Sequence, residues 1–154
     1  MANLTSNSMA DLDPAFQPVV QAIVDSCNAQ LAPSSMRVTV TWRSSADQAA
    51  AQAAGLSKAG PGASPHNCTL ADGTPSARAF DFAVFAPDGT YITRGADARY
   101  AQCGTIAKAV GQAQGVPVTF GGDWTPETDG CEPDSDHCEA TNWRATLITE
   151  PAGG

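Results

Sequence analysis

Residues 64–82 have the sequence "SPHNCTLADGTPSARAFDF", in which a polar loop runs into an apolar strand. The loop contains His66, one of only 2 histidines in the chain, and the strand places Asp81 between Phe80 and Phe82. An unpaired charge in apolar surroundings is costly, so the Asp81 carboxylate needs a cation, a hydrogen-bond network or a metal ion as its partner. The identity of this partner decides how this part of the chain is interpreted.

Composition indicates one domain with a sizeable hydrophobic core. The chain has 154 residues, of which 42% are hydrophobic and 16% charged, so we expect a single domain over residues 1–154 with flexible ends at 1–10 and 150–154. The formal net charge of -8 argues against a nucleic-acid-binding surface, which requires clustered Lys and Arg, and against attraction to anionic membranes. We expect a monomer whose partner is neither nucleic acid nor a membrane.

The sequence from Met1 to Phe16, "MANLTSNSMADLDPAF", contains neither the basic segment nor the apolar segment of a secretory signal. No uninterrupted apolar run is long enough to cross a bilayer. We therefore expect synthesis in a cytoplasm without a signal peptide, and export by another route if the protein works elsewhere.

Apolar residues recur with helical spacing in some segments and alternate in others. "RVTVTW" (37–42), for example, places Val38, Val40 and Trp42 on one face, as a half-buried strand does. Helices and antiparallel strands follow one another without a β-α-β rhythm, so we predict an α+β fold in which a small antiparallel sheet is flanked by helices. The expected elements are, in order, a helix over 13–31, a strand over 37–42, a helix over 45–55, a loop over 57–78, a hairpin over 79–93, a helix over 96–115, a strand over 116–120, a loop over 121–136 and an extended segment over 137–149.

Polar side chains mark the beginnings of the first two helices. Asp13 can cap the first, although Pro18 removes one helical hydrogen bond and the regular part could begin there instead. Ser45, followed by Gln48 three residues later, forms a capping-box pattern for the second. Arg43 therefore lies at the junction between a strand and a helix.

The chain contains 5 cysteines, so at least one thiol is unpaired in a monomer. Cys27 and Cys103 fall on the apolar faces of expected helices, where free cysteines commonly act as small core residues. Cys68, Cys131 and Cys138 lie near the histidines in sequence, and a disulfide among them stays open. No pair has the C-x-x-C spacing, which disfavours a zinc-finger site.

His66, Asp81 and His137 form a candidate metal site, because both histidines lie at the edges of long polar loops that border strands. Two imidazoles and one carboxylate make up the three protein ligands of an open catalytic zinc site, whose fourth position water holds. Asp134 lies three residues before His137, close enough to act as the base that takes a proton from that water. A metal ion would thus supply the partner that Asp81 needs.

Two other interpretations of these residues stay open. Asp81 could pair with Arg43 or Arg78 alone, without any metal. The acidic segment "PETDGCEPDSDH" (126–137) could be a solvated loop, as runs of like charge usually are. Spacing alone does not decide, since no short motif such as H-E-x-x-H is present.

Four segments, in the order in which they occur, resemble one family of zinc peptidases. "TWRSSADQ" (41–48) is similar to its Tyr-Arg-Ser-x-x-x-Gln segment, and "SPH" with "ARAFDF" (77–82) to its Ser-x-His…Gly-x-Ala-x-Asp-Phe segment. "FGGDW" (120–124) resembles its Trp-Gly-Gly-Asp-Trp turn, and "DSDHCE" (134–139) its Asp-x-x-His-Phe-Glu end. The family includes D-Ala-D-Ala carboxypeptidases and the L-alanyl-D-glutamate endopeptidases of phage endolysins, and it shares a metal-site fold with lysostaphin and sonic hedgehog. The resemblance covers roughly residues 10–145.

The resemblance implies a hedgehog- or D,D-peptidase-like fold and a role for each matched residue. It implies a zinc cofactor, with Asp134 as the general base and Arg43 as the cation that stabilises the oxyanion. The zinc ligands that it implies are His66, Asp81 and His137. The residues that it places around the ligands or along the substrate cleft are Ser64, Gln48 and Trp124.

The sequence departs from the family pattern at three places. Fifteen positions, against seven in the family, separate the first matched histidine from the aspartate, so "CTLADGTPS" (68–76) resembles an insertion, which leaves the shape and specificity of one cleft wall open. Ala77 replaces the motif glycine, and Cys138 replaces the phenylalanine after the last histidine. A thiolate from Cys68 or Cys138 therefore stays open as a replacement ligand, although Cys138 in an extended segment points away from the preceding histidine.

The resemblance implies a zinc-dependent peptidoglycan peptidase of the endolysin type, which hydrolyses the L-Ala–D-Glu bond of the stem peptide and acts on the cell wall after release. The alternatives are a D-Ala-D-Ala carboxypeptidase with the same site, a non-catalytic zinc-containing binding module, and a binding protein stapled by disulfides. The presence of both Asp134 and Arg43 favours catalysis over a structural site. A carboxypeptidase needs a further cation for the terminal carboxylate. The cations near the motifs are few: Lys58, Arg78, Arg94 and Arg144.

Overall fold

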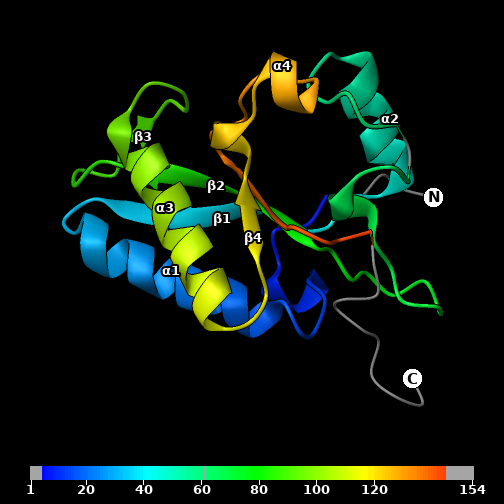
Figure 1. Cartoon of the computed structure of the whole chain (residues 1–154), viewed down its shortest axis with the longest axis horizontal. Coiled ribbons are helices and arrows are strands. Elements are labelled where there is room, and N and C mark those ends of the chain that lie inside the picture. The colour runs from blue at the N-terminus through cyan, green and yellow to red at the C-terminus, as the bar shows by residue number, and fades with distance from the viewer. Residues whose placement is uncertain (1–4, 61, 145–154) are drawn as a thin grey trace.

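The fold is built on a five-stranded antiparallel sheet whose central strand is β2 (Figure 1). The computed structural model describes residues 5–60 and 62–144. Within them the strand order is β1-β2-β5-β4, and β3 pairs with the part of β2 that β5 leaves uncovered. The α+β class with a small antiparallel sheet is confirmed. The strands are β1 (Ser35–Val40), β2 (Ala79–Phe85), β3 (Tyr91–Ile92), β4 (Val118–Phe120) and β5 (His137–Ala140).

Helices α1 and α3 pack side by side against one part of the sheet, and α2 and α4 lie toward its other end (Figure 1). Among the residues described, no helix combines the length and the apolar character needed to span a membrane. The α-helices are α1 (Gln17–Leu31), α2 (Ser45–Ala53), α3 (Ala98–Ala113) and α4 (Pro126–Asp129). The short 3-10 helices are η1 (Met9–Asp11), η2 (Pro65–Asn67) and η3 (Gly121–Asp123).

Strand β2 separates the core from the candidate site, because side chains of a strand alternate between its two faces. Phe80, Phe82 and Val84 are buried in the core with α1 and α3, and the Phe82 ring stacks on Tyr100 with centroids 5.5 Å apart. One cysteine from each of these helices joins the core, as predicted. Asp81 lies between the two phenylalanines and therefore points to the opposite face.

The predicted hairpin over 79–93 is confirmed. Strands β2 and β3 are antiparallel, and the turn between them contains Gly89, whose φ of 88° favours glycine. Strand β1 ends at Val40, since its pairing with β2 shifts by one residue between Val38 and Val40. Trp42, expected within this strand, consequently lies beyond its end.

The first helix begins at Gln17 rather than at Asp13, with Pro18 in its first turn. This is the alternative start that the proline suggested. Asp13 is not the N-cap residue of this helix, but the two oxygens of its fully buried carboxylate have different partners. Oδ1 accepts from the Ala15 N–H (3.0 Å) in the turn before the helix, and Oδ2 accepts from the Ser76 hydroxyl (3.2 Å) and from Nε of Arg78 (3.4 Å). One oxygen thus stays in the local turn that leads into the helix, and the other joins a tertiary polar network.

Ser44, not Ser45, caps the second helix, and its Oγ accepts from the Asp47 N–H at 3.1 Å. The cap thus lies one residue earlier than predicted. Gln48 completes no capping box and turns inward, where it is fully buried.

The N-terminal end is hydrogen-bonded where it is described. The Ser6 N–H donates to the Trp42 carbonyl at 2.8 Å, and the Ser6 carbonyl accepts from the Thr41 N–H at 2.7 Å. This part of residues 1–10 therefore pairs with the rest of the chain. Residues 1–4 lie outside the described part.

The last expected segment is shorter than predicted. Strand β5 ends at Ala140, and residues 141–144 form a turn. The remainder, residues 145–149, and the expected flexible end at 150–154 lie outside the described residues.

Candidate metal centre and active site

Three separate elements carry His66, Asp81 and His137. His66 lies in η2, whose N-cap is Ser64, and the Ser64 Oγ accepts from the His66 N–H at 3.2 Å. Asp81 lies in β2 and His137 begins β5, and the antiparallel register of these strands places the two residues directly opposite each other. Ser64 thus shapes the turn that presents His66.

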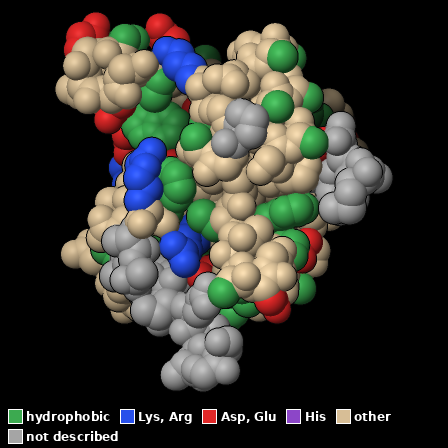
Figure 2. Space-filling view, turned by 90° about the vertical axis from the view of Figure 1, so that its right-hand side faces the viewer, with side chains coloured by type: hydrophobic (Ala, Val, Ile, Leu, Met, Phe, Trp, Pro, Cys, Tyr) green, Lys and Arg blue, Asp and Glu red, His purple; other side chains and the backbone are tan. Residues whose placement is uncertain are grey.

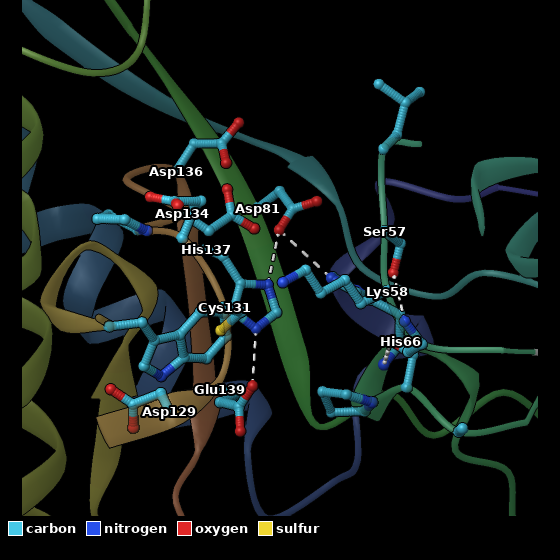
Figure 3. A pocket seen from close by; sticks show the side chains of 18 of the residues that line it. Ser57, Lys58, His66, Asp81, Asp129, Cys131, Asp134, Asp136, His137 and Glu139 are labelled. Carbon is cyan, nitrogen blue, oxygen red and sulfur yellow. Dashed lines mark hydrogen bonds and ion pairs between the residues drawn. The ribbon is translucent and has the colours of Figure 1, made fainter. Parts of the chain in front are cut away.

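The three side chains converge on one point (Figure 3). Their candidate ligand atoms all lie within 4.8 Å of one another. Oδ1 of Asp81 is 3.0 Å from Nδ1 of His137 and 3.3 Å from Nε2 of His66. Both imidazoles are buried, whereas the Asp81 side chain is 18% exposed. Residues far apart in sequence therefore form one compact group that solvent reaches from the carboxylate side.

Hydrogen bonds fix which ring nitrogen of each histidine is available. Nδ1 of His66 lies 2.7 Å from the carbonyl oxygen of Thr41, and because that oxygen can only accept, Nδ1 carries the proton. Nε2 of His137 lies 2.8 Å from Oε1 of Glu139, and this carboxylate oxygen likewise accepts from the ring. The other nitrogens, Nε2 of His66 and Nδ1 of His137, both face Asp81.

This donor set fits a metal ion with an open coordination position. Two imidazoles and one carboxylate are ligands that zinc accepts in catalytic sites. The second nitrogen of each imidazole is held by a backbone carbonyl or a carboxylate, which is the usual support of a metal-binding histidine. The residues present therefore fit the metal that the sequence resemblance implies.

Electrostatics couple Asp81 to both imidazoles. Burial by itself raises the pKa of Asp81, but His66 and His137 hold that pKa well below its usual range. Burial lowers the pKa of His137, yet its hydrogen bonds with Asp81 and Glu139 raise this pKa to about 10. The Asp81 carboxylate and the His137 imidazole thus hold a shared proton strongly in the absence of a metal. Metal binding at a site of this kind releases such a proton.

None of the five cysteines belongs to the ligand group, and all five are free thiols. Cys138 is fully buried in the core, away from His137 as its place in an extended segment predicted, and burial raises the pKa of its thiol well above the ordinary value. Cys68 packs against the core. The thiolate ligands that the sequence left open are therefore not used, and the disulfide-stapled interpretation has no bridge to support it.

Arg43 lies beside the ligand group and is held at both ends. Its N–H donates to the His66 carbonyl at 2.9 Å, and its Nη1 donates to Oε1 of Gln48 at 3.1 Å. Nη2 is 3.9 Å from Oδ2 of Asp81, at the outer limit of an ion pair. Arg78, the other cation considered for Asp81, pairs with a different carboxylate. Asp81 is therefore not satisfied by arginine alone.

Asp134, the predicted base, lines the same cleft but shares its cation with a neighbour. Nη1 of Arg94 is 2.9 Å from Oδ1 of Asp134 and 3.0 Å from Oδ1 of Asp136. Burial, together with the nearby carboxylates of Asp134 and Asp81, raises the pKa of Asp136 to about 7. Asp136 is therefore a second candidate base, and Figure 3 shows it in the same part of the cleft.

Sequence reasoning assigned no role to Asp136, Glu139 or Arg94. Glu139 carried a signal that went unused, because residues two apart in a strand share a face and Glu139 follows His137 by two. The segment "DSDH" likewise offered Asp136 beside Asp134. Arg94 was counted among the cations near the motifs, but it lies just after the β2–β3 hairpin and no local pattern pairs it with the two aspartates.

Gly121 shows why the turn in "FGGDW" needs glycine. Its carbonyl accepts from the Asp134 N–H at 2.8 Å. A Cβ at this position would lie 2.6 Å from the Asp134 carbonyl oxygen and 3.3 Å from the Cβ of His137. A larger residue would push η3 away from the segment that carries both side chains.

The candidate ligands line a cleft of about 780 Å³, which Figure 2 shows as a hollow with basic and hydrophobic side chains along it. Loops at 55–59 and 129–134 contribute to its sides. Trp124 also lines it, with its ring centroid 5.3 Å from that of His137. The 68–76 segment does not line the cleft, and it closes on itself through a hydrogen bond between its two ends. The 68–76 segment therefore forms no wall of this cleft.

Comparison with known proteins finds a shared fold and no match in sequence. No protein-family model and no curated protein matches the chain. Among solved structures, the chain is similar to the crystal structure of the Serratia marcescens L-Ala D-Glu endopeptidase ChiX, with a TM-score of 0.60 and 20% sequence identity. The likeness covers 90% of this chain and 89% of that chain. At this identity the likeness shows a shared fold, and the protein that shares it is an L-Ala D-Glu endopeptidase.

Proposed function

We propose that the protein is a zinc-dependent peptidase that hydrolyses the L-Ala–D-Glu bond of the peptidoglycan stem peptide. The observation that carries the proposal is the orientation of His66 and His137. Each ring is held through one nitrogen and turns the other toward Asp81 in an open cleft. The fold shared with an L-Ala D-Glu endopeptidase over nearly the whole chain supports the choice of bond.

Arg43 is suited to stabilise the charge that develops on the carbonyl oxygen. His66, Asp81 and His137 would hold the ion, which when bound supplies Lewis-acid polarisation of the carbonyl and activation of a water. Arg43 stands beside this group with its guanidinium fixed by the buried amide of Gln48. Such a preorganised cation needs little rearrangement when negative charge forms.

The attacking water needs a proton acceptor, and Asp134 is the residue that we assign. In this role its carboxylate takes the proton and then delivers it to the leaving amide nitrogen of glutamate. The Arg94 guanidinium that it shares with Asp136 orients both carboxylates in the cleft. The carboxylate of Asp136 is the alternative acceptor.

The proposal includes a place of action. A peptidoglycan peptidase must reach the cell wall, so the protein would act there after its release from the cytoplasm in which it is made. A role in phage lysis rests on the sequence resemblance to the endolysin branch of the family.

Mass spectrometry of purified peptidoglycan digested by the protein, with and without a chelator, tests the proposal. Hydrolysis at the proposed bond exposes a new free amino group on glutamate, and the chelator abolishes it. Release of free D-alanine without such an end would instead establish a carboxypeptidase. A protein that retains stoichiometric zinc and cuts neither bond would be a non-catalytic module.

A further inference from the structure

The cleft contains four arginine or lysine side chains among the described residues, and three of them are already engaged. Arg43 faces Asp81, with Nη2 at 3.9 Å from the carboxylate. Arg94 is paired with two aspartates, and the guanidinium of Arg144 lies 4.2 Å from the ring centroid of Trp143. Lys58 is the fourth, and it forms no ion pair within the part of the chain that the structure describes.

Lys58 projects from a short loop at the mouth of the cleft (Figure 3). Its Nζ donates to the carbonyl oxygen of Gly130, on the opposite side of the cleft, at 3.0 Å. A lysine ammonium has three donors, and a neutral backbone carbonyl uses one of them. The charge of Lys58 is therefore not neutralised by this contact.

Two amides anchor the loop that carries Lys58: Nε2 of Gln52 donates to the Lys58 carbonyl at 3.3 Å, and the buried Gln48 binds the residues on both sides of it. Nε2 of Gln48, which is fully buried, donates to Oγ of Ser57 at 2.9 Å and to the carbonyl of Ala59 at 2.8 Å. These are the residues on either side of Lys58. Oε1 of the same amide accepts from Arg43. One buried side chain thus fixes both the cation beside the ligand group and the backbone that presents a second cation to the same cleft.

We propose that Lys58 binds a carboxylate of an anionic peptide substrate and makes the enzyme prefer that peptide to its amide. The inference rests on the proposed function, in which the residue after the scissile bond is a glutamate with a free carboxylate. A charge-assisted hydrogen bond from Lys58 to such a carboxylate is stronger than its bond to the Gly130 carbonyl, so the ligand displaces that contact. The carboxylate could belong to the glutamate or to the end of the peptide, and the experiment separates the two.

The test uses four stem tripeptides that differ in two groups. The glutamate carboxylate is free or amidated, and so is the C-terminus. Binding is measured by calorimetric titration in an Asp134→Asn background, where turnover is slow, and hydrolysis is measured with the parent chain. The variants compared are Lys58→Met, Lys58→Arg and, as a matched control, Lys108→Met, which removes the other lysine at a site where it pairs with Asp123 outside the cleft.

Lys58→Met should weaken binding and raise KM by about tenfold for peptides that keep the recognised carboxylate, with kcat little changed. Peptides with that carboxylate amidated should bind both proteins alike, Lys58→Arg should restore most of the preference, and Lys108→Met should change nothing. Equal affinity in Lys58→Met, an equal loss for acid and amide peptides, or no measurable binding to the Asp134→Asn protein that keeps Lys58 would each overturn the proposal. If that protein bound with the Lys58-dependent preference but the parent hydrolysed no peptide, the proposed function would be overturned and the Lys58 site would stand.

Discussion

Asp13 and Asp81 are both carboxylates drawn into polar networks of this molecule, and their partners differ in kind. Asp13 is fully buried, and its Oδ2 accepts from the Ser76 hydroxyl and the Arg78 guanidinium. Asp81 is 18% exposed, and its nearest neighbours are one nitrogen from each of two imidazoles, at 3.0 and 3.3 Å. Those imidazoles are held in place through their other nitrogens.

The difference separates a carboxylate that serves the fold from one that serves a site. A network closed by a hydroxyl and a guanidinium needs nothing from solution, because its charge is neutralised within the protein. A carboxylate beside two imidazole nitrogens needs a cation or a proton between them. Only the second of these groups lines the cleft. Four substitutions, taken from the largest expected effect to the smallest, test this contrast.

Asp81→Ala should abolish peptidase activity, by more than about a thousandfold, because several kcal/mol of metal-dependent stabilisation are lost with the ion. His66→Ala and His137→Ala should do the same. Elemental analysis of the purified variants should find most of the zinc gone, against about one zinc per chain in the parent. Stoichiometric zinc in all three variants would refute the ligand assignment.

Asp13→Ala should behave in the opposite way, with zinc retained and stability reduced. Removing one partner of a buried ion pair leaves Arg78 without its carboxylate and should lower the free energy of unfolding by roughly 2–4 kcal/mol. Urea denaturation of the chelator-treated protein measures this free energy without the contribution of the metal. In a double-mutant cycle, Arg78→Met should cost less in the Asp13→Ala background than in the parent. If Asp13→Ala lost zinc at an unchanged free energy of unfolding, Asp13 would serve the metal site and not the stability of the fold.

Local patterns in the sequence were sufficient for most of the elements, whereas the gathering of the three ligands was implied by the family resemblance and not decided by spacing alone. Alternation placed Asp81 on the face opposite Phe80 and Phe82, and the motif order brought the two histidines to the same strand ends. Local patterns did not show which polar side chains are hydrogen-bond or ion-pair partners of one another. Asp13 had the signature of a helix cap, and its Oδ1 does accept from the Ala15 N–H before the helix, but its Oδ2 binds long-range partners that no local pattern showed.

The same limit applies at the site. Gln48 matched a capping box in sequence, yet the cap lies one residue earlier and the amide is used inside, on Arg43 and the Lys58 loop. Arg94 reaches the two aspartates from just beyond the β2–β3 hairpin, at a position that no motif includes. Contacts between residues distant in sequence depend on how the loops are laid over the sheet, which one-dimensional spacing does not specify.

Asp134→Asn should keep both zinc and fold and lose turnover by about a hundredfold or more, the scale of a general base. The matched variant Asp136→Asn preserves the same shape next to the same arginine and should lose much less. Steady-state hydrolysis with parallel zinc analysis distinguishes the two. If Asp136→Asn were the crippled variant and Asp134→Asn nearly active, the base would be Asp136. If Asp134→Asn lost zinc while Asp81→Ala kept it, the two carboxylates would have exchanged roles.

Glu139→Gln should have the smallest effect of the four substitutions, a modest loss of zinc affinity. It tests most finely whether the network around Asp81 serves a metal site. Glutamine can still accept from Nε2 of His137, so the ring keeps its orientation, but the negative charge that makes the imidazole a better ligand is removed. Zinc affinity, measured by competition with a chromophoric chelator, should fall by about tenfold, the lower end of the range for groups that support a metal ligand. Glu132→Gln is the control, because it removes an equal charge from the cleft at a residue outside the ligand group. Equal zinc affinity in the two variants would mean that zinc binding by His137 does not depend on the Glu139 carboxylate. The groups that matter for zinc binding would then be Asp81 and the two imidazoles alone.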